Sequence, residues 1–416
     1  MAENQIRGIE GQDCPAIRVT QNAGCPSIRV KLTGGGETPE APLSDVNFYD
    51  YDGKRVASYT AADFAALTEM PANPSHQGLT AQGWNWSLAD AQAYVAAYGI
   101  LDIGQNYITD DGKTRFYLRI DSEARNEIPI TYTQSISEGV VIDWGDGSTP
   151  ERVAGTSGTR LTHSYNPGEY ILTVEVTEGT VTLGGGSYSY PVIGSSSVNT
   201  RVFTNMVKRI ELGSGIVLAN GAFGLFTGLT SISIPKYLTA IPTTCFYEAV
   251  ALRFIALPEG CVVGDRLLYY NYSLSNVSLP KDAALPANYF NTCRSLQRIC
   301  LPAADISDNA FYYCSDLSVV IIPQGCTAIG TSAFYNCQGI ALFIIPASVT
   351  SIGATAFRDC RGVGEFHFKG TTPPTIASDT FSNIPADCKI YVPASAVATY
   401  QGATNWSTYA SQIVGE

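Results

Sequence analysis

The stretch IIPASVTSIGATAFRDC, residues 344–360, is the clearest copy of an internal repeat that fills the C-terminal half of the chain. Each copy carries the pattern Leu-x-x-Ile/Val-x-Ile/Leu-Pro, and its prolines are Pro235, Pro258, Pro280, Pro302, Pro323 and Pro346. These prolines lie 23, 22, 22, 21 and 23 residues apart, which is within the period range of leucine-rich solenoids. The spacing therefore predicts a stack of short coils over residues 206–385.

Each coil is predicted to hold one short strand that proline ends, because proline has no N–H for the ladder. A short helical turn is expected to follow, as at residues 356–360. Phenylalanine recurs at that turn, and a cysteine often follows it by three residues: Phe223, Phe246, Phe290, Phe311, Phe334, Phe357 and Phe381, with Cys293, Cys314, Cys337 and Cys360. Since one coil cannot bury its own apolar face, we expect a phenylalanine ladder and a thiol ladder inside the stack.

The repeat resembles that of BspA-like leucine-rich repeat proteins, which reads roughly I-x-I-P-x-S-V-T-x-I-G-x-x-A-F-x-x-C. Residues 344–360 match this pattern most closely, 321–337 match nearly as well, and the resemblance extends over about 207–400. It implies a recognition scaffold of the kind found on microbial surfaces and in phages, and it implies no catalyst.

A second resemblance lies upstream, in VIDWGDGS at 141–148, HSY at 163–165 and PGEYILTV at 167–174. The glycines at 145 and 147 and the stretch 166–168 predict tight turns, and residues 170–176 alternate with the period of a strand. These marks resemble the polycystic-kidney-disease-type (PKD) domain, so we expect a PKD-like β-sandwich over residues 114–205.

Residues 43–113 predict a small α/β module. Thr60 and Ser87 each precede a helical pattern with an acid three residues later, which is a capping-box arrangement, and Gly99 is a stop signal for the second helix. Asp52-Gly53 and Asp111-Gly112 are expected to form hairpin turns. The whole chain is thus predicted to be mainly β and multi-domain, with a C-terminal cap over residues 386–416.

The first 42 residues are expected to form a docking arm and linker. CPAIRV at 14–19 and CPSIRV at 25–30 are near copies, and GGG at 34–36 opens a flexible linker. Two similar strands on such a linker suit strand addition to another protein, and the candidate docking residues are Ile17, Val19, Ile28 and Val30. The alternative is a disordered tail.

Composition excludes some classes of function. There are 25 Lys+Arg and 37 Asp+Glu, a net charge of −12, which argues against nucleic-acid binding. No apolar stretch has the length of a signal peptide or membrane helix, so no membrane insertion is expected. The 11 cysteines are an odd number, which in a reducing cytosol predicts free, buried thiols.

The sequence contains few residues that could form a catalytic site. His76, His163 and His367 lie in three different predicted modules, and no nucleophile elbow, phosphate loop or zinc-protease motif is present. The acids at 50–52, 110–111 and 143–146 are better explained by turns than by calcium, because no 12-residue calcium loop follows them. We therefore predict no enzyme, no catalytic residue, no cofactor and no metal.

The outward side of the solenoid strands offers a candidate interface. Residues between the inward pair of each strand are expected to face solvent: Ser231, Ser233, Phe254, Ala256, Asn276, Ser278, Arg298 and Cys300. In the last full repeats they are aliphatic, namely Val319, Ile321, Leu342 and Ile344, and these four form the candidate interface. Three alternatives remain for what covers this patch: the C-terminal segment 391–414 folded back on it, subunit packing in a homo-oligomer, or an external partner.

These features predict a non-enzymatic structural and adhesion protein. With neither an export signal nor an anchor in the sequence, the leading hypothesis is a bacteriophage virion appendage of the head or tail, made in the host cytoplasm. Its arm would bind other virion proteins, and its solenoid would bind a bacterial surface protein or glycan. The alternative is a BspA-like adhesin on the bacterial cell surface, and a carbohydrate-active accessory protein is the third reading.

Overall fold

The computed structural model describes residues 17–20, 29–32, 44–121, 127–185, 191–194, 200–302 and 304–416. The chain divides into two compact units, Met1–Leu43 and Ser44–Glu416, and its fold is mainly β, as the sequence predicts. In the first unit, β1 (Ile17–Thr20) and β2 (Arg29–Leu32) pair in antiparallel fashion with Val19 opposite Val30. The candidate docking residue Ile28 lies outside the described residues.

The second unit begins with a four-stranded sheet and two helices. The strands are β3 (Val46–Tyr49), β4 (Arg55–Tyr59), β5 (Leu79–Trp84) and β6 (Leu101–Thr109), in the order β4-β3-β6-β5. The two predicted helices are α1 (Ala61–Ala65) and α2 (Leu88–Tyr98). Their caps are those the sequence predicts, since Thr60 and Ser87 each accept a hydrogen bond from the third following N–H at 3.1 Å. We call residues 44–112 the docking module.

Of the two hairpin turns predicted for this module, one is confirmed and one is wrong. The Asp52-Gly53 turn does join the antiparallel strands β3 and β4. The turn at Asp111-Gly112 joins β6 to β7 (Thr114–Ile120), which lie in different sheets, so the predicted hairpin is wrong there. The reason is that β7 pairs with strands that come later in the chain and leaves β6 to the docking module.

Two facing sheets follow the docking module. One has the order β10-β9-β12-β7-β14-β16, and the other has the order β11-β8-β13-β15. Their remaining strands are β8 (Glu127–Gln134), β9 (Val140–Asp143), β10 (Glu151–Arg152), β11 (Thr159–Ser164), β12 (Gly168–Val176), β13 (Val181–Leu183), β14 (Val207–Glu211), β15 (Ile216–Leu218) and β16 (Ser231–Ser233), with α3 at Thr200–Thr204. Because β14, β15 and β16 belong to the first coils, both sheets run directly into the solenoid.

The turn singled out in the sequence anchors this part of the core. Trp144 is fully buried, His163 stacks on it at 4.7 Å, and the Tyr165 hydroxyl donates to its carbonyl at 2.9 Å. Gly145 has φ +76°, and a Cβ there would lie 2.3 Å from the Ile171 carbonyl oxygen. Only glycine fits this close approach of two backbones.

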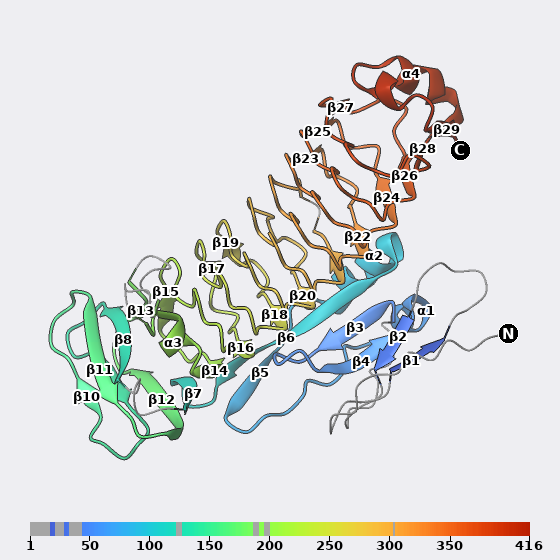
Figure 1. The fold of residues 1–416 in the computed structure, drawn as a ribbon. Helices are drawn as coiled ribbons and strands as arrows, with labels where there is room; N and C mark the ends of the chain where they lie inside the picture. The colour runs from blue at the N-terminus through green and yellow to red at the C-terminus, as the bar shows by residue number, and fades with distance from the viewer. Residues whose placement is uncertain are drawn as a thin grey trace. The chain divides into compact units, whose positions relative to one another are not determined.

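The coils carry two separate ladders of short parallel strands (Figure 1). Along one side run β18 (Phe254–Ala256), β20 (Asn276–Ser278), β21 (Arg298–Cys300), β22 (Val319–Ile321), β24 (Leu342–Ile345), β26 (Glu365–Phe368) and β28 (Lys389–Val392). Along the other run β17 (Ala240–Ile241), β19 (Val262–Val263), β23 (Ala328–Ile329), β25 (Ser351–Ile352) and β27 (Thr375–Ile376). Partners are one coil apart, as in Leu342 opposite Glu365.

The predicted helical turn after each strand is not a helix. Thr355 and Asp359, on either side of Phe357, have the left-handed φ values 53° and 61°, and most other coils repeat this arrangement. The N–H groups of Phe357 and Asp359 donate to Thr380 and Ser382 of the next coil, at 2.9 and 3.0 Å. A helix would turn these groups toward its own chain, so the bonds between coils favour the irregular form.

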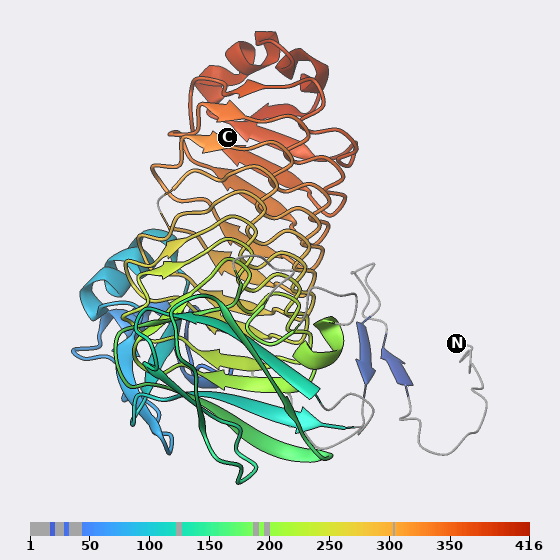
Figure 2. The ribbon, with the colours of Figure 1, turned by 90° about the vertical axis from the view of Figure 1, so that its left-hand side faces the viewer.

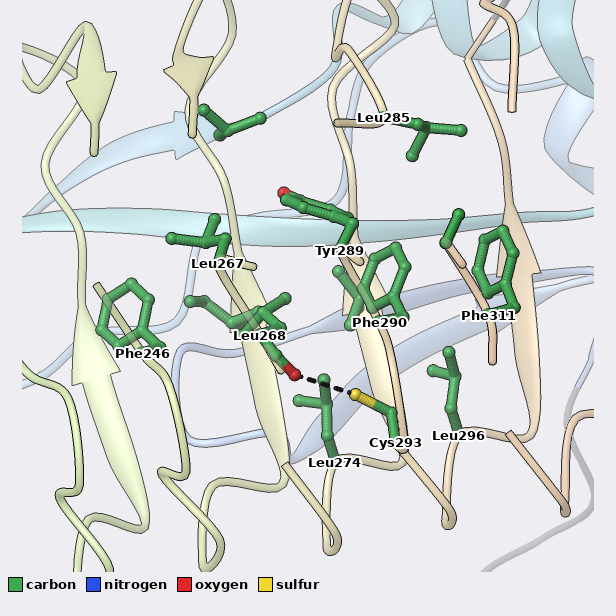
Figure 3. Packing of buried hydrophobic residues seen from close by; sticks show 14 of the residues in the cluster. Phe246, Leu267, Leu268, Leu274, Leu285, Tyr289, Phe290, Cys293, Leu296 and Phe311 are labelled. Atoms are coloured by element: carbon green, nitrogen blue, oxygen red, sulfur yellow. Dashed lines mark hydrogen bonds between the residues drawn. The ribbon is translucent and has the colours of Figure 1, made fainter. Parts of the chain in front are cut away.

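Both predicted ladders are present in the core. Phe290, Phe311, Phe334 and Phe357 stack at centroid distances of 5.2 to 5.6 Å. Leu268 takes the phenylalanine position in one coil, and Cys293 Sγ donates to its carbonyl at 3.1 Å (Figure 3). All nine described cysteines are free and buried, as predicted, and burial raises the pKa of the Cys360 thiol to about 12.

The last coil is closed by the C-terminal segment, which contains η2 (Ala394–Ala396), α4 (Val397–Gly402), η3 (Trp406–Tyr409) and β29 (Ile413–Gly415). Figure 2 shows the coils stacked one on another up to this red segment. Trp406 is fully buried, with its ring 5.1 Å from Phe368 and 5.6 Å from Phe381. The segment therefore covers the open end of the core, as solenoids require.

Candidate interaction face

The outward side chains of β14, β16 and the following strands form one face of the second unit, and the docking module covers its middle. Strand β6 lies across β16, β18, β20 and β21 (Figure 1). Gly104 permits this contact, since a Cβ there would lie 2.3 Å from the Cβ of Ala256. The eight outward residues from Ser231 to Cys300 point away from the solenoid core, but seven are buried and Asn276 is half-buried, so the expectation that they face solvent is wrong. The docking module, with β6 at its centre, covers this part of the face.

Side-chain amides of the docking module hydrogen-bond to carbonyls of the coils. Asn85 donates to the Leu257 carbonyl at 3.0 Å, and Asn106 donates to the Ile234 carbonyl at 3.0 Å. The Trp86 indole donates to the Leu279 carbonyl at 2.8 Å. These bonds satisfy polar groups that β6 removes from water, so the covered part of the face is a specific packed contact.

A buried ion pair fixes the far edge of this contact. Arg298 is 5% exposed, and its Nε donates to the Asp102 carboxylate at 2.7 Å. Its other nitrogens reach the carbonyls of Ser44, Asp45 and Leu101. Burial alone would lower the pKa of Arg298, but the hydrogen bond and the charge of Asp102 outweigh it and raise the pKa. The guanidinium therefore stays charged.

Beyond Arg298 the face is open, and the four candidate interface residues lie there. Val319, Leu342 and Ile344 are 40%, 42% and 49% exposed, and Ile321 is half-buried. They lie on β22 and β24 of successive coils, and we call them the apolar patch. The C-terminal segment packs over the end of the last coil and leaves them exposed, so the expectation that it folds back on them is wrong.

Polar groups border the apolar patch on both sides. On one side, Tyr98 of α2 accepts a hydrogen bond from the Gln324 N–H at 3.1 Å. On the other, His367 bonds Glu365 at 3.0 Å and Glu416 at 2.8 Å. Hydrogen bonds from Lys369 and His367 hold the pKa of Glu416 below its usual value, so the Glu416 carboxylate is charged near neutral pH.

The histidines and acids that were candidates for catalysis or metal binding form hydrogen bonds within turns or with a nearby partner. His76 bonds Asp50 and His163 bonds Asp146, both at 2.7 Å, each in its own part of the chain. Asp143 accepts from the Gly145 N–H in the turn that follows it. Across the ranges the structure describes, no three His, Cys, Asp or Glu side chains gather as metal ligands would. No described helix has the length and apolar character to cross a membrane.

Comparison with known proteins bears on the coils. Residues 216–341 and 304–407 match the family described as BspA type leucine rich repeat region, in 6 copies. The coils are therefore similar to BspA-type leucine-rich repeats. This confirms the resemblance seen in the sequence, whereas the comparisons do not confirm the PKD-type resemblance upstream. BspA-type repeats indicate a surface adhesion or protein-interaction role, and nothing found shows catalysis.

One solved structure similar to this chain is a leucine-rich repeat protein from Bacteroides ovatus ATCC 8483. The match has 24% sequence identity and a TM-score of 0.39, and it covers 45% of this chain. The chain spans 56% of that protein's length. A search among curated proteins gives no match.

Proposed function

We propose that this chain is a non-enzymatic adhesion protein that binds a protein on a bacterial surface through the apolar patch. One observation carries the proposal. The outward face of the BspA-type coils is buried under β6 as far as Arg298, and the next two strands then expose Val319, Leu342 and Ile344. A face that is buried along one part and aliphatic along the next suits a second protein surface.

The arrangement of the apolar patch supports binding to a protein. Its centre is aliphatic, while α2 on one side and the charged cluster around His367 on the other form a polar border. Protein interfaces combine such a desolvated centre with a polar rim that excludes water. The patch lies on strands of a rigid stack, so little ordering would be needed on binding.

A charge placed in the apolar patch tests the proposal. Labelled protein is titrated onto intact cells of the strain in which the gene resides, and Leu342→Asp and Ile344→Asp are each expected to weaken saturable binding about tenfold. Val262→Asp is the matched control, because Val262 is 71% exposed on the other ladder of strands. Equal binding by all three variants and the parent contradicts the proposal.

We further propose that the protein is a phage virion appendage attached by its N-terminal arm. The support is that residues 1–43 form a compact unit of their own and hold the antiparallel pair β1 and β2. The docking residues Ile17, Val19 and Val30 lie on these strands. Mass spectrometry of purified particles is expected to find the chain. Its detection only in bacterial envelopes would favour the alternative, a cell-surface adhesin.

A further inference from the structure

A groove lies on the same face, beside the part that β6 covers. It has a volume of about 880 Å³ and opens to solvent. Its lining comes from four neighbouring strands, β12, β7, β14 and β16, from the turn at Gly145, and from the turn at Tyr51 and Asp52 in the docking module. The apolar patch is on later coils, so the groove is a separate feature.

The residues on the floor of the groove are held in place by contacts with one another. The guanidinium carbon of Arg209 lies 3.7 Å from the centroid of the Tyr117 ring. The Tyr117 hydroxyl donates to Glu211 at 2.7 Å, and Arg209 Nε lies 3.4 Å from the same carboxylate. Glu211 is 3% exposed, so it supports the stack from beneath. The aromatic and planar surface of the floor is therefore formed before a ligand arrives.

The rim carries both signs of charge and an apolar side chain. Arg119 and Glu169 are exposed, Lys208 is half-buried with its Nζ donating to the Asn205 carbonyl, and Ile171 is an exposed aliphatic group. The cations of the groove and its floor are Arg119, Lys208 and Arg209, and the anions are Asp52, Glu169 and Glu211. Arg119 also pairs with Asp121 beside the groove, at 3.0 Å. The positive and negative charges are thus nearly balanced, so the groove favours neither a polyanion nor a polycation.

We propose that this groove binds a neutral oligosaccharide. Sugar hydroxyls both donate and accept hydrogen bonds, so they can pair with the carboxylates and the cations of the rim alike. The C–H faces of a pyranose ring can pack on Ile171 and on the planar stack of Arg209 over Tyr117, which supply the flat and apolar surface that ligand sites require. A charged polymer would leave half of the rim paired with like charge.

Calorimetric titration of the full chain tests the proposal with maltohexaose, cellohexaose, mannohexaose and xylohexaose, and with a galacturonate hexamer as the anionic probe. At least one neutral hexamer is expected to bind with a Kd below about 1 mM. Glu169→Gln and Lys208→Gln should each weaken it about tenfold, because each removes charge-assisted hydrogen bonds. Lys113→Gln is the control, since Lys113 pairs with Glu175 outside the groove.

The proposal is overturned if no neutral hexamer binds, if the galacturonate hexamer binds more tightly than all of them, or if Lys113→Gln weakens binding as much as the groove variants. Leu342→Asp is expected to leave oligosaccharide binding unchanged, because the apolar patch lies on later coils. The adhesion proposal can therefore fail while the oligosaccharide proposal holds, and the oligosaccharide proposal can fail while the adhesion proposal holds.

Discussion

The guanidinium of Arg298, on strand β21 of the solenoid, and the carboxylate of Asp102, on strand β6 of the docking module, form an ion pair that is almost completely buried. The two residues are 196 positions apart in the sequence, and Arg298 Nε donates to the Asp102 carboxylate at 2.7 Å. This pair lies at the boundary between the covered and the open parts of the face, and the apolar patch begins on the strand that follows, β22.

Removing one partner of this pair should destabilise the second unit. Asp102→Asn leaves the Arg298 charge buried and is expected to lower the free energy of unfolding by about 3–5 kcal/mol in urea titrations. Glu175→Gln, in the half-exposed pair with Lys113, should cost below about 1 kcal/mol. Similar losses in the two variants would show that the Arg298 pair does not hold the docking module in place.

The close approach at Gly104 gives a second test of the same contact. Gly104→Ala places a Cβ 2.3 Å from Ala256 Cβ and 3.0 Å from Ser278 Cβ, so the strands must separate, at about 1–3 kcal/mol. Adding Ala256→Gly should recover part of that loss in a double-mutant cycle. Gly402→Ala, with no atom within 4 Å, is the control for backbone effects. Additive losses at positions 104 and 256 would count against the contact.

The thiol ladder should be chemically silent in the folded protein. Burial raises the pKa of Cys245 and of Cys300 to about 12, and all nine described cysteines are buried. Since the thiolate is the reactive form, iodoacetamide at about pH 8 should leave these nine unlabelled and should label all of them in denaturant. Peptide mass spectrometry reads each site. Rapid native labelling of any one of the nine would contradict the packing described.

Acid should weaken the coils at Asp305. The N–H groups of Thr327 and Ala328 donate to its carboxylate at 2.7 and 2.9 Å, and the Thr327 bond contributes most to lowering its pKa. A lowered pKa stabilises the fold above the ordinary carboxyl range, and the gain is lost as the pH falls through the folded value. Urea midpoints at neutral pH and near pH 3 should therefore differ less in Asp305→Asn than in the parent. Equal differences would exclude this role.

The repeats could be predicted from the sequence because each position recurs every coil. The places of the strands, of Phe334 and of Cys337 follow from the period alone, and the structure has them where the pattern puts them. The left-handed turns were missed because most of them are occupied by residues other than glycine, and the residue type varies from Thr, Asn and Asp to Tyr and Arg.

The covering of the face by β6 could not be predicted in the same way. Asp102, Asn85 and Asn106 form hydrogen bonds with residues 128 to 196 positions away, and these contacts do not recur from coil to coil. Signals were nevertheless present. Phe254 is an aromatic residue at an outward position where the neighbouring coils carry serine and asparagine, and strand β6 mixes polar residues with apolar ones. Both patterns are typical of a surface covered by another element.

The most direct measurement of the central claim is the binding of Leu342→Asp and Val262→Asp variants to intact bacterial cells, side by side with the parent. If the apolar patch is the binding surface, the affinity falls about tenfold for Leu342→Asp while Val262→Asp matches the parent, with equal unfolding midpoints in all three. Equal affinities for folded Leu342→Asp and the parent would contradict the account.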